Sequence, residues 1–186
     1  MFNKNSIIIE SNIKDALRLI DGITKYDYIY FDNFMNEYED TIKDIISLVN
    51  ESGIVFLNNS KKGITPFYMD LYLLKYIGER KIYNEYISGL FTRTYILPSD
   101  FTKSETFDLI NRKITMNKFF TRNLPNKNIL CISENEKLIK LILNTNCKHT
   151  FIVHNPEFRK KLFLKYIETN LEPEIIKIEN LAVVST

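Results

Sequence analysis

The chain is poor in glycine: its 186 residues contain five, and none follows Gly89. Glycine lets a backbone approach a phosphate closely, and no phosphate loop of the Gly-x-x-x-x-Gly-Lys type occurs in the sequence. The most familiar signal for a nucleotide phosphate is therefore missing. Tryptophan is absent as well, but 13 phenylalanines and 11 tyrosines supply the aromatic content of a folded globular protein.

Cysteine and histidine are equally scarce, with two of each. Two cysteines exclude a disulfide framework and a four-cysteine zinc site, so we expect Cys131 and Cys147 to be buried packing residues. Neither His149 nor His154 has a carboxylate or a cysteine at a recognisable metal spacing, and no metal site is predicted. Cys131 and His154 could form a nucleophile and its base, but a cysteine in an apolar strand is more often part of the core.

Long apolar runs are also missing, because no uncharged stretch approaches the roughly 20 residues that cross a bilayer. The N-terminus lacks the basic-then-apolar pattern of a signal peptide. These features predict a soluble, cytoplasmic protein without a membrane partner.

The net charge of +2 hides an uneven distribution. Residues 1–60 hold five Lys/Arg against ten Asp/Glu, residues 61–131 hold twelve against six, and residues 132–186 hold eight against seven. Within 103–127, cations alternate with phenylalanines, a pattern that can neutralise phosphates and stack on unpaired bases. The same pattern also fits a solvated helix face whose rings point into the core. The cations predicted to bind nucleic acid are Arg112, Lys113, Lys118 and Arg122.

Hydrophobic periodicity predicts short strands that alternate with helices. This alternation indicates one α/β domain over residues 1–186, with a mostly parallel sheet covered by helices on both faces. Gly53 is expected just beyond the end of the second helix. The expected strands are 6–10, 26–32, 54–58, 129–132, 150–154 and about 175–184, with further strand segments in 81–97 around a turn at Gly89. The expected helices are 12–20, 36–50, 66–77, 103–122, 135–144 and 156–170.

Ligands of such sheets bind beyond the carboxyl ends of the strands, where the strand order reverses. The residues that follow the predicted strands are therefore candidates for a site. Asp32 is the most suggestive, because a carboxylate at a strand end can accept hydrogen bonds from an amine or a ribose. A capping role for Asp32 at the next helix is the alternative. The full set is Asp32, Asn33, Asn58, Asn59, the segment 133–135 and the segment 154–157.

The order of these segments resembles the permuted group of amino-group DNA methyltransferases that use S-adenosylmethionine. In that group the catalytic half comes first, a target-recognition region follows, and the cofactor half comes last. The corresponding parts of this chain are 1–60, 61–127 and 128–186. The resemblance implies a Rossmann-like methyltransferase-type fold and a nucleic-acid target.

The catalytic segment departs from the group's Asp-Pro-Pro-Tyr. This chain has Asp32-Asn33-Phe34-Met35, so Asp32 is retained and both prolines are replaced. In the group the Asp and the following backbone hold the target amine, and the aromatic ring stacks on the flipped base. The resemblance therefore assigns Asp32, Asn33 and Phe34 to catalysis, with Phe34 one position away from the expected ring.

The cofactor half departs further from the sequence pattern of this group. The group's glycine-rich turn corresponds to a stretch with Ser133 and Glu134, which carries side chains throughout. The acidic residue that usually holds the ribose hydroxyls falls at Val153. Asn155 and Glu157 of an Asn-Pro-Glu run remain as cofactor candidates, although Asn-Pro also begins helices.

Two hypotheses of different classes follow, and the departures favour the first. In the first, the chain is a silent or weakened relative that binds nucleic acid or acts as a partner subunit or homo-oligomer, with S-adenosylmethionine bound weakly or not at all. In the second, it is an active amino methyltransferase on DNA or RNA. A third possibility, a small-molecule methyltransferase or spermidine-synthase-like enzyme, rests on residues 8–58 alone.

Overall fold

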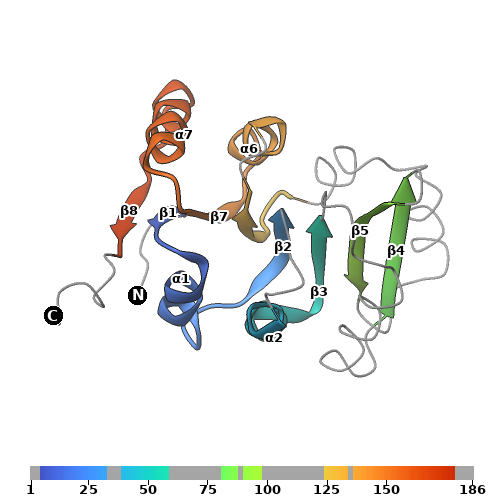
Figure 1. Cartoon of the computed structure of the whole chain (residues 1–186). Coiled ribbons are helices and arrows are strands. Elements are labelled where there is room, and N and C mark those ends of the chain that lie inside the picture. Colours follow the sequence, from blue (N-terminus) through green and yellow to red (C-terminus); the bar gives the residue numbers. More distant parts are fainter. Residues whose placement is uncertain are drawn as a thin grey trace, which may run out of the picture.

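The computed structural model describes residues 5–32, 39–58, 81–87, 90–97, 124–133 and 136–178 (Figure 1). Within these ranges no helix is long and apolar enough to span a membrane. The strands are β1 (Ser6–Glu10), β2 (Tyr26–Asp32), β3 (Val49–Asn58), β4 (Lys81–Ile87), β5 (Leu90–Leu97), β6 (Asn128–Ile132), β7 (Lys148–Val153) and β8 (Glu174–Lys177). The helices are α1 (Ile13–Ile20), α2 (Glu39–Leu48), α6 (Glu136–Leu143) and α7 (Pro156–Glu168).

These eight strands form one sheet in the order β4-β5-β3-β2-β6-β7-β1-β8. The six strands from β3 to β8 in that order are parallel, and β5 and β4 are added antiparallel beside β3. The predicted α/β fold with a mostly parallel sheet is therefore confirmed. β6 and β7, from the last third of the chain, lie between β2 and β1, which come from the first.

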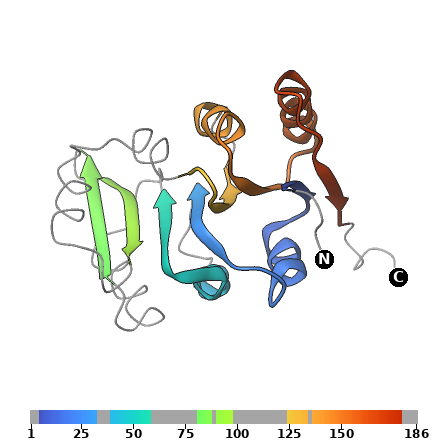
Figure 2. The same cartoon turned by 180° about the vertical axis from the view of Figure 1, so that it is seen from behind.

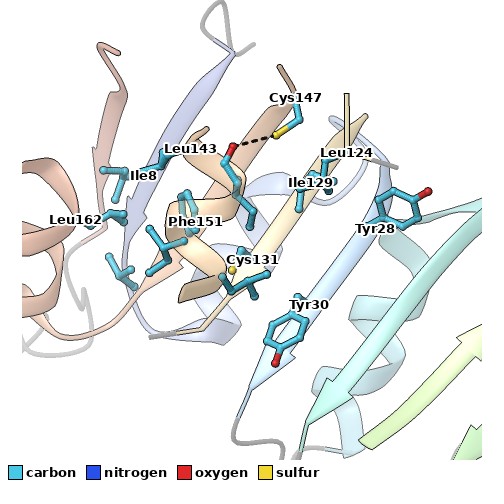
Figure 3. Close-up of a cluster of buried hydrophobic side chains, with 14 of the residues drawn as sticks. Ile8, Tyr28, Tyr30, Leu124, Ile129, Cys131, Leu143, Cys147, Phe151 and Leu162 are labelled. Carbon is cyan, nitrogen blue, oxygen red and sulfur yellow. Dashed lines mark hydrogen bonds between the residues drawn. The ribbon is translucent and has the colours of Figure 1, made fainter. Parts of the chain in front are cut away.

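The sheet is covered on both faces, α1 and α2 lying on one side and α6 and α7 on the other (Figures 1 and 2). Successive residues of a strand point to opposite faces, and β1 shows this directly. Ile7 and Ile9 belong to the apolar cluster under α1 and α2, whereas Ile8 belongs to the cluster under α6 and α7. Figure 3 shows part of the second cluster, in which Phe151 and Leu162 pack near Ile8.

Hydrogen bonds from polar side chains to one another and to the backbone connect β2, β3 and β6 near the amino ends of these strands. Asn50 donates from Nδ2 to Asp27 Oδ1 at 3.0 Å, and the backbone N–H of Asn128 donates to Asp27 Oδ2 at 2.8 Å. Asn128 Nδ2 in turn donates to the carbonyl of Lys25 at 2.8 Å. One carboxylate in β2 is therefore hydrogen-bonded to both neighbouring strands, β3 and β6.

The boundary between α2 and β3 differs from the prediction. The helix expected over 36–50 ends at Leu48, and β3 begins at Val49, so Gly53 lies inside a strand. The β2–β3 register shifts between Tyr26 and Tyr28, which lets the chain around Gly53 press against β2. A Cβ on Gly53 would lie 2.7 Å from the carbonyl oxygen of Asp27. Close backbone approach, and not the end of a helix, explains this glycine.

Some of the other predicted elements are confirmed, and the rest lie outside the described residues. Strands are confirmed over 81–87 and 90–97, and α1, α6 and α7 lie where helices were expected. The predicted helices 66–77 and 103–122, the turn at Gly89 and residues 179–184 lie outside the described residues.

Candidate functional site at the carboxyl edge of the sheet

The strand order reverses between β2 and β6, which are neighbours in the sheet. The chain leaves β2 through α2 toward β3 on one side, and it leaves β6 through α6 toward β7 on the other. The two helices cover opposite faces (Figure 1). Such a reversal opens a crevice beyond the carboxyl ends of the two strands, and this is where parallel α/β sheets bind ligands.

Asp32 and Ser133 lie level with each other at the carboxyl ends of β2 and β6. Phe31 pairs with Ile132 in the β2–β6 register, so the next residue of each strand stands at the same level of the edge. Ser133 is buried, with 6% of its surface exposed. The structure describes the backbone of Asp32, whereas Asn33, Phe34 and Glu134 lie outside the described residues. The register therefore places the backbones of these two strand-end candidates next to each other, and their roles stay a prediction.

Asn155 and Glu157 form the N-terminal cap of α7. Asn155 is the N-cap residue, and its Oδ1 accepts a hydrogen bond from the backbone N–H of Glu157 at 2.9 Å. Pro156 occupies the first turn, as is typical of helix starts. The exposed Glu157 carboxylate lies 3.5 Å from Lys160 Nζ. The Asn-Pro-Glu run therefore has a complete local explanation in the helix that it begins.

Val153 ends β7 with an apolar, buried side chain. It is 2% exposed and belongs to the cluster under α6 and α7, together with Phe158 and Leu162. A valine at this strand end offers no acceptor to a ribose hydroxyl. The position at which the resemblance expects a carboxylate is instead part of the core.

A carboxylate that the sequence reasoning missed lies directly beside Val153. Glu10 pairs with Val153 in the β1–β7 register and is 6% exposed. Its Oε1 accepts a hydrogen bond from Arg159 Nε at 3.2 Å, and its Oε2 lies 3.7 Å from Lys177 Nζ. The sequence feature that could have identified Glu10 is an acidic residue at the end of a run of isoleucines. Asp32 was identified by the same kind of feature.

Ser11 continues this edge after Glu10. Its backbone N–H donates to the carbonyl of Val153 at 2.9 Å, and 5% of its surface is exposed. Buried polar residues therefore stand at two separate places on the carboxyl edge, at the end of β1 and just after β6, with β7 between them. These residues are Glu10, Ser11 and Ser133.

The cysteines and histidines do not form a site at this edge. Cys131 and Cys147 are both buried, as predicted, while His154 is exposed. His149 lies near the amino end of β7, with Nδ1 3.7 Å from Cys147 Sγ. Burial lowers the pKa of His149 from its ordinary value of 6.5 to about 4. Among the residues that the structure describes, no group of three His, Cys, Asp or Glu side chains is placed to hold a metal ion.

The proposed nucleic-acid contacts cannot be placed on the sheet. Arg112, Lys113, Lys118 and Arg122 all lie outside the described residues, which resume at Leu124. The basic segment 103–127 therefore stays a prediction from sequence.

No family profile matches the chain, and no curated protein sequence matches it. Similar solved structures are found. The crystal structure of M1.HpyAVI is similar over 86% of this chain and 97% of its own, with 14% identity and a TM-score of 0.59. TTHA0409 of Thermus thermophilus, a candidate DNA modification methylase, is similar over 93% of this chain and 100% of its own, with 9% identity and a TM-score of 0.62.

Structures of both neighbours with S-adenosylmethionine bound are also similar to this chain, with TM-scores of 0.58 and 0.60. At identities of 7–14% these similarities concern the fold. The chain therefore has a methyltransferase-like α/β fold.

Proposed function

We propose that the chain is a methyltransferase-like protein whose cofactor site is weakened or lost, and that it acts as a nucleic-acid-binding or partner subunit. The order of its strands supports a permuted arrangement. β2, which ends in Asp32, precedes β6 and β7 in the chain, yet it lies beside β6 at the reversal of strand order.

The buried side chain of Val153 is the observation that carries the proposal. A cofactor with a ribose lying over β7 needs an acceptor at this strand end, and the side chain of a valine in the buried apolar cluster cannot supply one. Unpaired ribose hydroxyls in a closed site would lose their water without compensation, which costs affinity.

The neighbouring carboxylate does not replace the missing acceptor. Glu10 stands beside Val153, but its two oxygens face Arg159 and Lys177. Recruiting Glu10 to a ligand would mean breaking a buried, charge-assisted hydrogen bond. The turn after β6 adds to this argument, since it contains no glycine that would let the backbone approach a ligand closely.

An active amino methyltransferase is the second candidate. The observation in its favour is that Asp32 ends β2 and Ser133 follows β6, the two adjacent strands at the reversal. In that reading Asp32 accepts a hydrogen bond from the target amine, and the ring of Phe34 stacks on the base. The basic segment 103–127 would then hold the phosphates.

Titration of the whole chain with S-adenosylmethionine in a calorimeter separates the two candidates. The proposal expects no binding tighter than about millimolar, which corresponds to a gain of only some 4 kcal/mol. A thermal unfolding measurement with and without the cofactor provides a second readout, because a ligand that binds the native state raises its stability. A micromolar dissociation constant, accompanied by a raised melting temperature, would overturn the proposal and favour the enzyme.

A further inference from the structure

α7 is held to the sheet differently at its two ends. At its start, Asn155 caps the helix, and Arg159 Nε donates to the buried carboxylate of Glu10 at 3.2 Å. Near its end, Tyr166 packs over the amino end of β7, where its ring centroid lies 5.5 Å from that of His149. The first end is therefore fixed by a charge-assisted hydrogen bond, whereas the second is held by the packing of rings.

Two buried polar atoms at this second end lack a hydrogen-bond partner. His149 is 2% exposed and Tyr166 is fully buried. Among the residues that the structure describes, neither His149 Nε2 nor the hydroxyl of Tyr166 has a partner. Burying a polar group without a hydrogen bond costs free energy, and that cost is recovered when the group reaches water. The contact between His149 and Tyr166 is therefore a weak point in the packing of α7 against the sheet.

The surroundings of His149 do not compensate a positive charge. His149 makes no ion pair with any residue that the structure describes. Burial raises the pKa of the Cys147 thiol and of the Tyr166 hydroxyl, so neither supplies a negative charge near neutral pH. The titratable and charged side chains on the elements around the ring are Cys131 of β6, Cys147 before β7, Tyr166 of α7, and Lys165 of α7, which lies 4.0 Å from Glu136 of α6.

We infer that the C-terminal half of α7 is an acid-sensitive segment, which lifts from β7 and exposes His149 while the start of the helix stays fixed to Glu10. Lifting lets water reach the two unpartnered atoms, and it gives His149 a solvent in which a proton can be held. The inference does not depend on the proposed function.

The direction of the pH effect follows from the burial of His149. Burial lowers its pKa from 6.5 to about 4 in the closed arrangement. As the pH falls from 6.5 toward 4, the open arrangement therefore takes up a proton that the closed one does not bind. A proton that binds one of two arrangements shifts the population toward it, so acid favours the open one.

The opening is local because β7 is held on both sides. In the sheet His149 pairs with Ile129 of β6 on one side and with Ser6 of β1 on the other. Separating these strands would break the interior of the sheet, whereas lifting the last turns of α7 leaves the pairing of β7 intact. Helix ends open at a lower free energy than interior strands do.

Hydrogen exchange of the full chain at about pH 7 and about pH 5, corrected for the intrinsic rate at each pH, tests the inference. Amides near Tyr166, over residues 163–169, should open at least about tenfold more often than those of β2 and β6, and low urea should not change their opening. Their opening constant should rise about twentyfold at the lower pH, as expected for a group with a pKa of 6.5 when open and about 4 when closed.

Two variants separate the proton from the unpartnered atoms. His149→Gln removes the titrating group and should abolish the twentyfold rise. Tyr166→Phe removes one buried hydroxyl, so it should make opening rarer by roughly fivefold at both pH values and keep the rise. His154→Gln, at the exposed histidine just beyond the other end of β7, is the matched control and should behave as the wild type does.

Three results would overturn the inference. The first is exchange near Tyr166 that is as slow as in β2 and β6, because the helix then opens only when the whole chain unfolds. The second is an opening constant that does not rise in acid, or that still rises in His149→Gln. The third is a Tyr166→Phe variant that opens more often than the wild type.

Discussion

Arg159 Nε donates a hydrogen bond to Glu10 Oε1 at 3.2 Å, joining the start of α7 to the carboxyl end of β1 across 149 residues of sequence. The Glu10 side chain is 8% exposed and that of Arg159 is 27% exposed, so this pair is more protected from solvent than an ordinary surface ion pair.

Replacing this carboxylate should lower stability measurably. Glu10→Gln keeps the shape but removes the charge that faces Arg159, and hydrogen bonds to charged groups contribute about 2 kcal/mol. Urea unfolding should show a loss of that order. Glu157→Gln, which removes a pair with exposed side chains at the start of the same helix, should stay within about 0.5 kcal/mol of the wild type. Equal losses for the two variants would contradict the assigned role of Glu10.

His149 should make the protein sensitive to mild acid. Burial lowers its pKa from 6.5 to about 4, so the unfolded chain takes up the proton at a higher pH than the folded chain does. The contribution of neutral His149 is complete above pH 6.5 and is lost as the pH falls toward 4. At about 1.4 kcal/mol per unit of pKa, the total loss is roughly 3 kcal/mol.

Unfolding in urea at about pH 7 and about pH 5 measures this effect. His149→Gln removes the titrating group and should flatten the difference between the two pH values. His154→Gln, at an exposed site, should leave that difference as it is in the wild type. If His149→Gln retains the full pH dependence, the acid sensitivity comes from other groups.

Asp32→Ala tests the catalytic role of the carboxylate at the end of β2. In an active enzyme, removing an oriented acceptor for the target amine should lower the rate of methyl transfer by about a hundredfold or more. Asp32 is not the N-cap of α2, because that helix begins at Glu39, so the variant should keep the melting temperature of the wild type. Methyl transfer and melting temperature are measured on the same samples. Unchanged transfer in an active protein would exclude the catalytic role.

The basic segment can be tested by the salt dependence of nucleic-acid binding. If Arg112, Lys113, Lys118 and Arg122 contact phosphates, the logarithm of the affinity for duplex DNA should fall with the logarithm of salt concentration, by a slope of about 0.9 per phosphate. Changing all four to alanine should reduce the slope by roughly 4. Replacing Lys14 and Arg18 on α1 is the control and should leave the slope unchanged. If the wild type does not bind DNA even at low salt, the segment is only a solvent-exposed helix face.

Local patterns predicted most of the sheet, because an apolar run such as Ile7-Ile8-Ile9 needs no distant partner to be recognised as a strand. The capping role of Asn155 was likewise visible in the Asn-Pro dipeptide. The contacts that shape the site were not visible. Glu10 faces Arg159 only because β1 lies beside β7, and no local pattern specifies that neighbour.

The start of β3 was mispredicted for a related reason. Apolar spacing through Ile45 and Ile46 continues to Val49, so the pattern alone predicts a helix that extends beyond Leu48. The close approach of Gly53 to the Asp27 carbonyl fixes the strand there, and that approach depends on the pairing of β2 with β3.

The placement of β6 and β7 between β2 and β1 also constrains how the protein is made. β1 pairs only with β7 and β8 in the described sheet, so it leaves the ribosome before its partners and has no neighbour in this sheet until residues beyond Lys148 have been synthesised. At about 5–20 residues per second, that delay amounts to roughly 7–28 seconds. During this time the isoleucines of β1 lack the strands that cover them in the folded sheet.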